Sequence, residues 1–148
     1  MDYRLELVLI PVSDVDRAKK FYLEQAGFVL IVDTPIAENQ RIVQVVPPGS
    51  ECAIGFGTGV TSAAPGAAQG LHLVVSDILG AHAELTGRGV PVSGVRHIQD
   101  GTWVDGPHPQ RENYQSFADF TDPDGNIWIL QEVDRSGVDR SRAEHESD

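Results

Sequence analysis

The sequence predicts an α+β fold made of two similar halves, each with the element order βαβββ. Three observations support this prediction. SFADFTDPDGNIWILQEV (116–133) has apolar alternation on both sides of an Asp-Pro-Asp-Gly turn, which is typical of a β-hairpin. RIVQVVPPGSECAIGFG (41–57) repeats the order of strand, proline-containing turn and strand. VSDVDRA (12–18) is matched by VSDILGA (75–81), so a motif near the start of the chain is repeated near its middle.

Composition indicates one globular domain. The chain has 148 residues, of which 41% are hydrophobic and 22% charged, and we expect residues 1–133 to form the domain. The apolar run 7–12 is far shorter than the roughly 20 residues that span a bilayer, and no basic segment precedes it as in a signal peptide. The only cysteine, Cys52, excludes an internal disulfide, and we expect a cytoplasmic protein.

The net charge of -11, without any Lys/Arg cluster, excludes nucleic acid and anionic membranes as expected partners. The acidity indicates either simple solubility or a site that favours cations. The chain also lacks the GxSxG, P-loop, Rossmann and paired CxxC signatures.

In the first half, Ser13 and Asp14 are placed to cap a helix, and Gly27 is placed to end it in a left-handed conformation. We therefore expect module one at about 4–57, followed by a flexible linker at about 58–69. Its elements are a strand at 4–12, a helix at 15–26 and strands at 28–33, 40–46 and 52–57, with a loop at 34–39.

The second half, module two at about 70–133, repeats this plan. Asp77 is expected to cap a helix at 78–88, between strands at 71–75 and 91–95. HIQDGTWVDGPHPQRENYQ (97–115) shows no periodic pattern and is interpreted as a long insertion, either a binding loop over a site or a solvated loop. Residues 134–148 are polar and are expected to form a disordered tail.

Two such halves, with VSDVDRAKKFY before Gly27 in the first and FTDPDGN before the last strand, resemble the vicinal oxygen chelate superfamily. That superfamily includes glyoxalase I, extradiol dioxygenases, thiol transferases that confer fosfomycin resistance, and bleomycin-resistance proteins. The resemblance covers about residues 5–133. It implies two modules related by pseudo-two-fold symmetry, with curved mixed sheets that form cups around a ligand, and it implies a homodimer.

The resemblance also implies four metal-ligand positions, two in each half. In this sequence they fall on Leu7, on Ala53 or Gly55, on Gly70 and on Ile129, none of which can bind a metal ion. We therefore expect no metal ligands and no cofactor, and the usual metal-dependent chemistry of the superfamily is not expected.

Polar and aromatic side chains near these positions are the candidates for ligand binding. His72 and Gln131 lie two residues beyond Gly70 and Ile129, and residues two apart on a strand share a face. Glu51 shares the parity of Ala53, and the superfamily's pattern places a pocket residue at Asp119. If Asp119 reaches His72, we expect the two to form a pair across the cup. The predicted ligand-binding residues are His72, Asp119, Gln131, Glu51, Phe117 and Trp103, and His97, His108 and Tyr114 are further residues of the insertion.

Two functions are compatible with these residues. The first is a metal-independent protein of the bleomycin-resistance kind that binds a small aromatic or cationic molecule. The alternative is a lyase, isomerase or dioxygenase-like enzyme with a non-standard site, in which His72 acts as general base because histidine titrates near neutrality. The sequence identifies no catalytic residue beyond this candidate.

Overall fold

A computed structural model describes residues 1–134, so the expected tail lies, from residue 135 onward, outside the described residues. The first half contains β1 (Leu7–Leu9), α1 (Val15–Lys20), a π-helical turn η1 (Phe21–Gln25), β2 (Val29–Ala37), β3 (Gln40–Val46) and β4 (Ala53–Thr58). The second half contains β5 (Leu71–Val75), α2 (Ile78–Gly87), β6 (Arg96–Gln99), β7 (Thr102–Asp105), β8 (Ser116–Thr121) and β9 (Ile127–Glu132).

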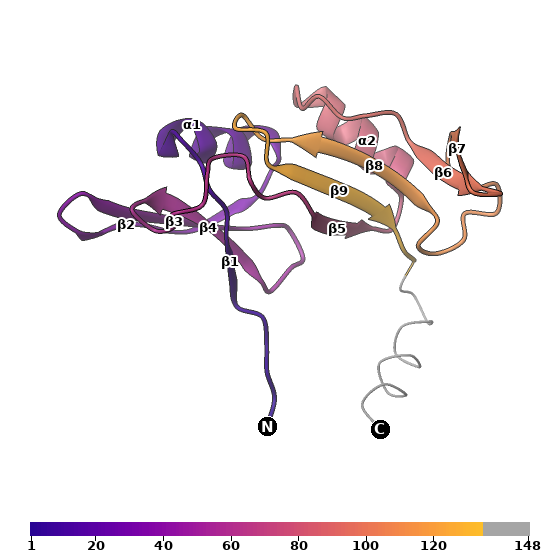
Figure 1. Cartoon of the computed structure of the whole chain (residues 1–148). Helices are drawn as coiled ribbons and strands as arrows, with labels where there is room; N and C mark the ends of the chain where they lie inside the picture. Colours follow the sequence, from indigo (N-terminus) through magenta and orange to yellow (C-terminus); the bar gives the residue numbers. More distant parts are fainter. Residues whose placement is uncertain (135–148) are drawn as a thin grey trace.

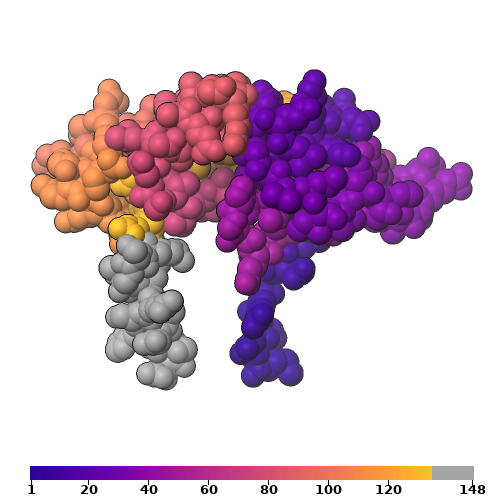
Figure 2. Space-filling view, turned by 180° about the vertical axis from the view of Figure 1, so that it is seen from behind, coloured from indigo at the N-terminus to yellow at the C-terminus, as the bar shows by residue number. Residues whose placement is uncertain are grey.

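Each half forms its own mixed sheet. The first sheet has the strand order β1-β4-β3-β2 and the second the order β5-β9-β8-β6-β7. In each sheet the first strand of the half pairs in parallel with its last strand, β1 with β4 and β5 with β9, and the other pairs are antiparallel. Both helices lie on the same side of the two sheets (Figure 1), and the halves lie side by side (Figure 2). The predicted α+β class with mixed sheets is confirmed.

The repeated capping motifs form the helix starts that the sequence predicts. The Asp14 side chain accepts a hydrogen bond from the Arg17 N–H at 3.1 Å, and the Asp77 side chain accepts one from the Gly80 N–H at 3.2 Å. Gly27 follows the first helical segment with φ +78, and an added Cβ there would lie 2.0 Å from the Arg88 guanidinium. The left-handed backbone is what favours glycine here, because the guanidinium is the end of a flexible side chain that could move aside.

One core joins the halves, and Tyr22 lies at its centre. The Tyr22 ring contacts Phe28, Phe56 and Trp128, with ring centroids 5.5, 5.5 and 5.8 Å away. Its hydroxyl donates to Asp122 Oδ2 at 2.7 Å and accepts from Trp128 Nε1 at 3.0 Å. Burial, reinforced by the Asp122 carboxylate, raises the pKa of Tyr22, so the phenol remains a donor.

The Asp-Pro-Asp-Gly-Asn turn before β9 fixes the second half to the first. The fully buried Asn126 donates its amide N–H to the Pro11 carbonyl at 2.8 Å and accepts the Ala68 N–H at 3.0 Å. The buried Asp122 accepts the backbone N–H groups of Asp124 and Asn126, both at 2.9 Å. One turn therefore holds both the segment before α1 and the end of the linker.

The stretch 97–115, expected as an unpatterned insertion, begins instead with a β-hairpin. Strands β6 and β7 pair through the turn Asp100-Gly101, where both residues have positive φ (+53 and +77). An Asp-Gly pair favours such two-residue turns, so residues 100 and 101 are the local signal for this hairpin. The expected strand 91–95 is wrong: only Val92 bridges to Phe120, and β6 takes its place in the sheet. The second sheet therefore has five strands.

Other boundaries also differ from the prediction. The first strand is 7–9 rather than 4–12, and the expected helix 15–26 changes to π-helical geometry at Phe21. The expected loop 34–39 is mostly strand, because β2 continues to Ala37 at the edge of its sheet and turns tightly at Asn39 (φ +62). Pro35 is tolerated there because it lies on an edge strand.

Candidate ligand-binding site

One face of the second sheet packs on the helices and the opposite face does not. Trp128, Leu130 and Glu132 of β9 are buried on the helix side. The residues between them, Ile129 and Gln131, belong to the other side, because strand side chains alternate. This other side, termed the open face, carries His72, Val74, Arg96, Trp103, Phe117, Asp119, Ile129 and Gln131, as the strand register shows.

The structure brings five of the six predicted ligand-binding residues together on the open face. His72, Ile129 and Asp119 form one cross-strand row, and Gln131 and Phe117 belong to the next. Their placement on one face agrees with the rule, used in the sequence prediction, that residues two apart on a strand share a face. That these side chains bind a ligand stays a prediction.

Trp103 and Phe117 form an aromatic wall on the open face. Their rings meet edge to face, with centroids 5.7 Å apart and planes at 87°. Trp103 is 51% exposed, whereas the other tryptophan, Trp128, is buried in the core. A half-exposed indole beside a phenyl ring offers a surface on which a flat aromatic molecule can stack.

Arg96, which the sequence prediction missed, organises the polar part of the open face. Its guanidinium lies 5.0 Å from the centroid of the Trp103 ring, in cation–π geometry. Nη2 donates to Asp119 Oδ2 at 2.7 Å, and Nη1 donates to Ser93 Oγ at 2.9 Å. Had 96–99 been recognised as a strand, parity would have placed Arg96 and Ile98 on one face, and the observed register sets Arg96 opposite Phe117.

The expected pair of His72 and Asp119 is not formed. In the part of the chain that the structure describes, no hydrogen bond or ion pair joins them. The Asp119 carboxylate forms its ion pair with Arg96 instead. The reason is spacing: Ile129 stands between them, so the two side chains are two strands apart, about 10 Å at roughly 4.8 Å per strand.

His72 is exposed on β5, at the edge of the second sheet. Its Nδ1 lies 3.0 Å from the Gly70 carbonyl oxygen, and a carbonyl only accepts, so Nδ1 carries the proton and Nε2 of the neutral ring is an acceptor. The turn 47–50 of the first half lies beside His72, and together with Leu73 and Val74 they line a cavity of about 420 Å³.

The remaining candidates lie elsewhere. Glu51 is exposed in the turn before β4 and belongs to the first half. His97 is buried on the helix side of β6, where its Nδ1 donates to the Gly106 carbonyl at 2.8 Å, and the His108 ring is 6.0 Å from it. The Tyr114 carbonyl accepts a hydrogen bond from Gln131 Nε2 at 3.3 Å. Of the stretch expected as an insertion, Trp103 places its aromatic side chain on the open face.

The loop after β7 is fastened to the helix side by Arg111. Its guanidinium donates to the buried carboxylate of Glu132 and, at 3.2 Å, to Asp77. These hydrogen bonds hold the pKa of Glu132 below its ordinary value, and the hydrogen bond to Glu132, together with the negative charges, raises the pKa of Arg111. The loop backbone near Gln131 is thus anchored from the side away from the open face.

The positions where the superfamily's resemblance implies metal ligands do not fit a metal ion. Leu7 pairs with Ala53, Leu9 with Gly55, and Ile129 faces His72 across the ladder. Leucine, alanine, glycine and isoleucine side chains provide no donor atom. Among residues 1–134, no group of three His, Cys, Asp or Glu side chains could hold a metal ion.

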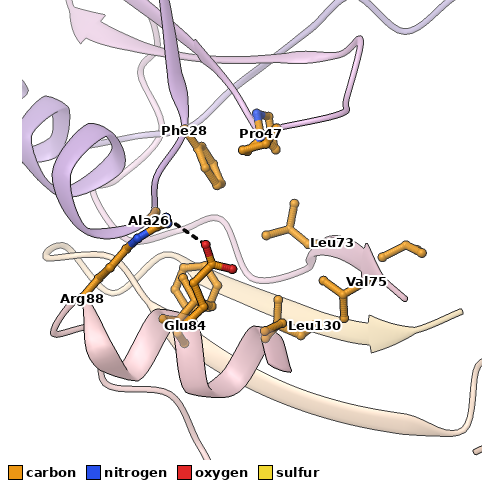
Figure 3. A pocket seen from close by; sticks show the side chains of 13 residues that line it. Ala26, Phe28, Pro47, Leu73, Val75, Glu84, Arg88 and Leu130 are labelled. Carbon is orange, nitrogen blue, oxygen red and sulfur yellow. Dashed lines mark hydrogen bonds and ion pairs between the residues drawn. The ribbon is translucent and has the colours of Figure 1, made fainter. Parts of the chain in front are cut away.

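A second cavity, of about 260 Å³, lies between the halves on the helix side of β5 (Figure 3). Phe28 and Pro47 of the first half face Leu73, Val75 and Leu130 of the second across it. Its polar border is the exposed ion pair of Arg88 with Glu84 at 2.8 Å. Such a cavity can take apolar groups but offers little to orient them, because both charged groups already have partners.

Residues 4–130 match the family model of the Glyoxalase/Bleomycin resistance protein/Dioxygenase superfamily. The crystal structure of TnmS3, an antibiotic binding protein from Streptomyces sp. CB03234, is 32% identical in sequence and superposes with a TM-score of 0.70, covering 90% of this chain and 98% of that one. A glyoxalase/bleomycin resistance protein from Streptomyces sp. CB03234 is 33% identical, with a TM-score of 0.67 and coverage of 86% and 99%.

Among curated proteins, the uncharacterized protein YetH of Bacillus subtilis (strain 168) is 24% identical over 126 residues, which is 84% of this chain and 94% of YetH. No helix in the described part of the chain is long and apolar enough to cross a membrane.

Proposed function

Because the chain belongs to the glyoxalase/bleomycin resistance protein/dioxygenase superfamily, we propose that it is a binding protein for a small aromatic molecule, of the antibiotic-binding kind. The observation that carries this proposal is the aromatic wall of Trp103 and Phe117 beside the Arg96–Asp119 pair. Stacking on the wall provides affinity, and the polar pair, with Gln131 in the adjoining row, provides orientation. We place this protein in the cytoplasm.

Binding is proposed to be independent of metal. The support is the chemistry of Leu7, Ala53, Gly55, Gly70 and Ile129, which supply no metal donor where the resemblance implies ligands. Affinity for the aromatic molecule should therefore be unchanged by a chelator.

We further propose that the protein works as a homodimer. No helix of the described residues covers the open side of either sheet, and the segment before β1 extends away from the body (Figure 1) with exposed apolar residues. Met1, Tyr3 and Leu5 are 105%, 90% and 70% exposed, and Leu9 on β1 is 41% exposed. A second copy is the occupant that would bury these surfaces. A mass of one chain by light scattering at micromolar concentration would contradict the dimer.

The alternative function, an enzyme with His72 as general base, has one specific observation in its favour. The bond from Nδ1 to the Gly70 carbonyl leaves Nε2 as the basic nitrogen, pointing away from the backbone partner. The enzyme function would be supported by turnover of a bound aromatic molecule. That turnover should be lost in His72→Ala and should persist when a chelator is added.

The test of the binding function is a thermal-shift screen against aromatic antibiotics in the presence of a chelator. A ligand at a hundred times its Kd adds about 2.7 kcal/mol of stability, which corresponds to a rise in Tm of about 8–10 °C for a chain of this size. Hits are then titrated calorimetrically with wild type, Trp103→Ala and, as control, Ile36→Ala, which removes a side chain 57% exposed on β2.

We expect Trp103→Ala to weaken binding by roughly tenfold or more, and Ile36→Ala to leave it unchanged. Equal affinity of all three proteins would show that the aromatic wall is not part of the binding site. No hit across the panel would contradict the binding function itself.

A further inference from the structure

Arg96 and Asp119 together present both hydrogen-bond donors and an acceptor on the open face. Arginine has five N–H donors, and the hydrogen bonds of the described residues use two of them, to Ser93 and Asp119. Asp119 Oδ2 accepts from Arg96, while no hydrogen bond within residues 1–134 ends on Oδ1. The side chains are 30% and 39% exposed, so the unused groups can be reached from solvent.

These two residues stand beside the aromatic wall, so a ligand stacked there removes water from them. Arg96 lies over the Trp103 ring, and Phe117 is its direct neighbour across the strands. Donors and acceptors that lose water without gaining a partner destabilise the complex. A ligand that binds well must therefore offer an acceptor to Arg96 and a donor to Asp119.

We propose that the Arg96–Asp119 pair selects aromatic ligands that carry an uncharged donor–acceptor group, such as a carboxamide or a ring hydroxyl beside a carbonyl. This inference rests on the proposed binding function and adds the chemical class of the ligand. In the bound state the carbonyl oxygen accepts from Arg96 and the N–H or O–H donates to Asp119 Oδ1.

Charged ligands are disfavoured by the same pair. An ammonium group would approach a carboxylate that Arg96 already neutralises at 2.7 Å, and would be repelled by the guanidinium. A ligand carboxylate that approached Arg96 would be repelled by the Asp119 carboxylate beside it. Asp105 pairs with Arg96 across β6 and β7 and is exposed, so solvent screens its attraction for a cation. His72 lies two strands from Asp119 and does not change this local balance.

The experiment compares three probes with one ring system: 2-naphthamide, 2-naphthoate and 2-naphthylmethylammonium. Each is titrated calorimetrically at pH 7.5 into wild type, Arg96→Gln and Asp119→Asn. The matched control is Asp33→Asn, because Asp33 is likewise held by an arginine, Arg41 at 2.9 Å, but on the helix side of the first sheet.

In wild type we expect the amide to bind roughly tenfold to a hundredfold more tightly than either charged probe, from the usual cost of an unpaired buried polar group. Asp119→Asn should shift the preference to naphthoate, and Arg96→Gln should shift it to the ammonium. Asp33→Asn should keep the wild-type order. These changes of preference distinguish recognition from a loss of folding, which would weaken all probes alike.

Tightest binding of the ammonium by wild type would overturn the inference and identify the face as a cation site. Tightest binding of naphthoate would overturn it in favour of a simple anion site at Arg96. An unchanged order in both variants would also refute it, while leaving the binding function intact. If no probe binds at millimolar concentration, the inference fails, whereas the binding function is decided separately by the panel of aromatic antibiotics.

Discussion

Replacing Tyr22 by phenylalanine tests whether the buried hydroxyl holds the two halves together. The substitution keeps the ring and removes the oxygen that donates to Asp122 and accepts from Trp128. A hydrogen bond to a carboxylate contributes about 1.5–3 kcal/mol, and the buried indole N–H left without a partner costs about 1–3 kcal/mol more. Tyr22 and Trp128 are 0% and 1% exposed, so water cannot replace the lost partner. We expect Tyr22→Phe to lower the free energy of unfolding by about 3–4 kcal/mol.

The assay is urea unfolding at pH 7, followed by tryptophan fluorescence and circular dichroism at one fixed protein concentration, because dimerisation would couple stability to concentration. Tyr3→Phe is the matched control, since that side chain is 90% exposed, and it should change stability by less than about 0.5 kcal/mol. A loss below about 1 kcal/mol for Tyr22→Phe would refute the reasoning.

Three further predictions concern the fold. Asn126→Ala should cost about 2–4 kcal/mol in urea unfolding, because the Pro11 carbonyl and the Ala68 N–H both lose a buried partner. Gly101→Ala should cost about 1 kcal/mol, since its φ of +77 disfavours any residue with a Cβ, whereas Gly94→Ala, at a glycine without positive φ, should cost less. Arg111 lowers the pKa of Glu132 in the folded state, so this carboxylate stabilises the protein above its ordinary pKa of 4.5, and the stabilisation is lost as pH falls below that value. Glu132→Gln should therefore lose less stability than wild type between pH 7 and pH 4, and a parallel loss in both would contradict this.

The sequence predicted the fold class and much of the open face for physical reasons. The capping aspartates and the repeated turns are local signals, and strand parity is a strict rule once a strand is recognised. Phe117, Asp119 and Gln131 share the open face because the hairpin that contains them was identified correctly.

The missed parts depend on contacts between distant segments. Arg96 was overlooked because 97–115 was interpreted as an insertion, although its Asp-Gly turn indicated a hairpin. The partner of Asp119 could not be deduced from spacing alone, because parity gives a face but not which of several neighbours a carboxylate meets. The π-helical turn at Phe21 likewise has no local signal in the sequence, and its residues Phe21 and Tyr22 are buried in the shared core.

The two sheets differ chemically on their open sides, and this difference bears on the proposed function. On the first sheet, Leu7 and Leu9 lie beside Gly55, where an added Cβ would come within 3.0 Å of both leucine side chains. That surface carries the two leucines and the Gln44 side chain, which lies opposite Gly55, whereas the second sheet presents the aromatic wall and the Arg96–Asp119 pair. In the proposed homodimer, Leu7 and Leu9 of one copy facing the open face of the other would suit a flat aromatic molecule. Introducing one histidine at Leu7 should create no tight metal site, since a divalent ion needs three or four donors and the neighbouring Ala53 and Gly55 supply none.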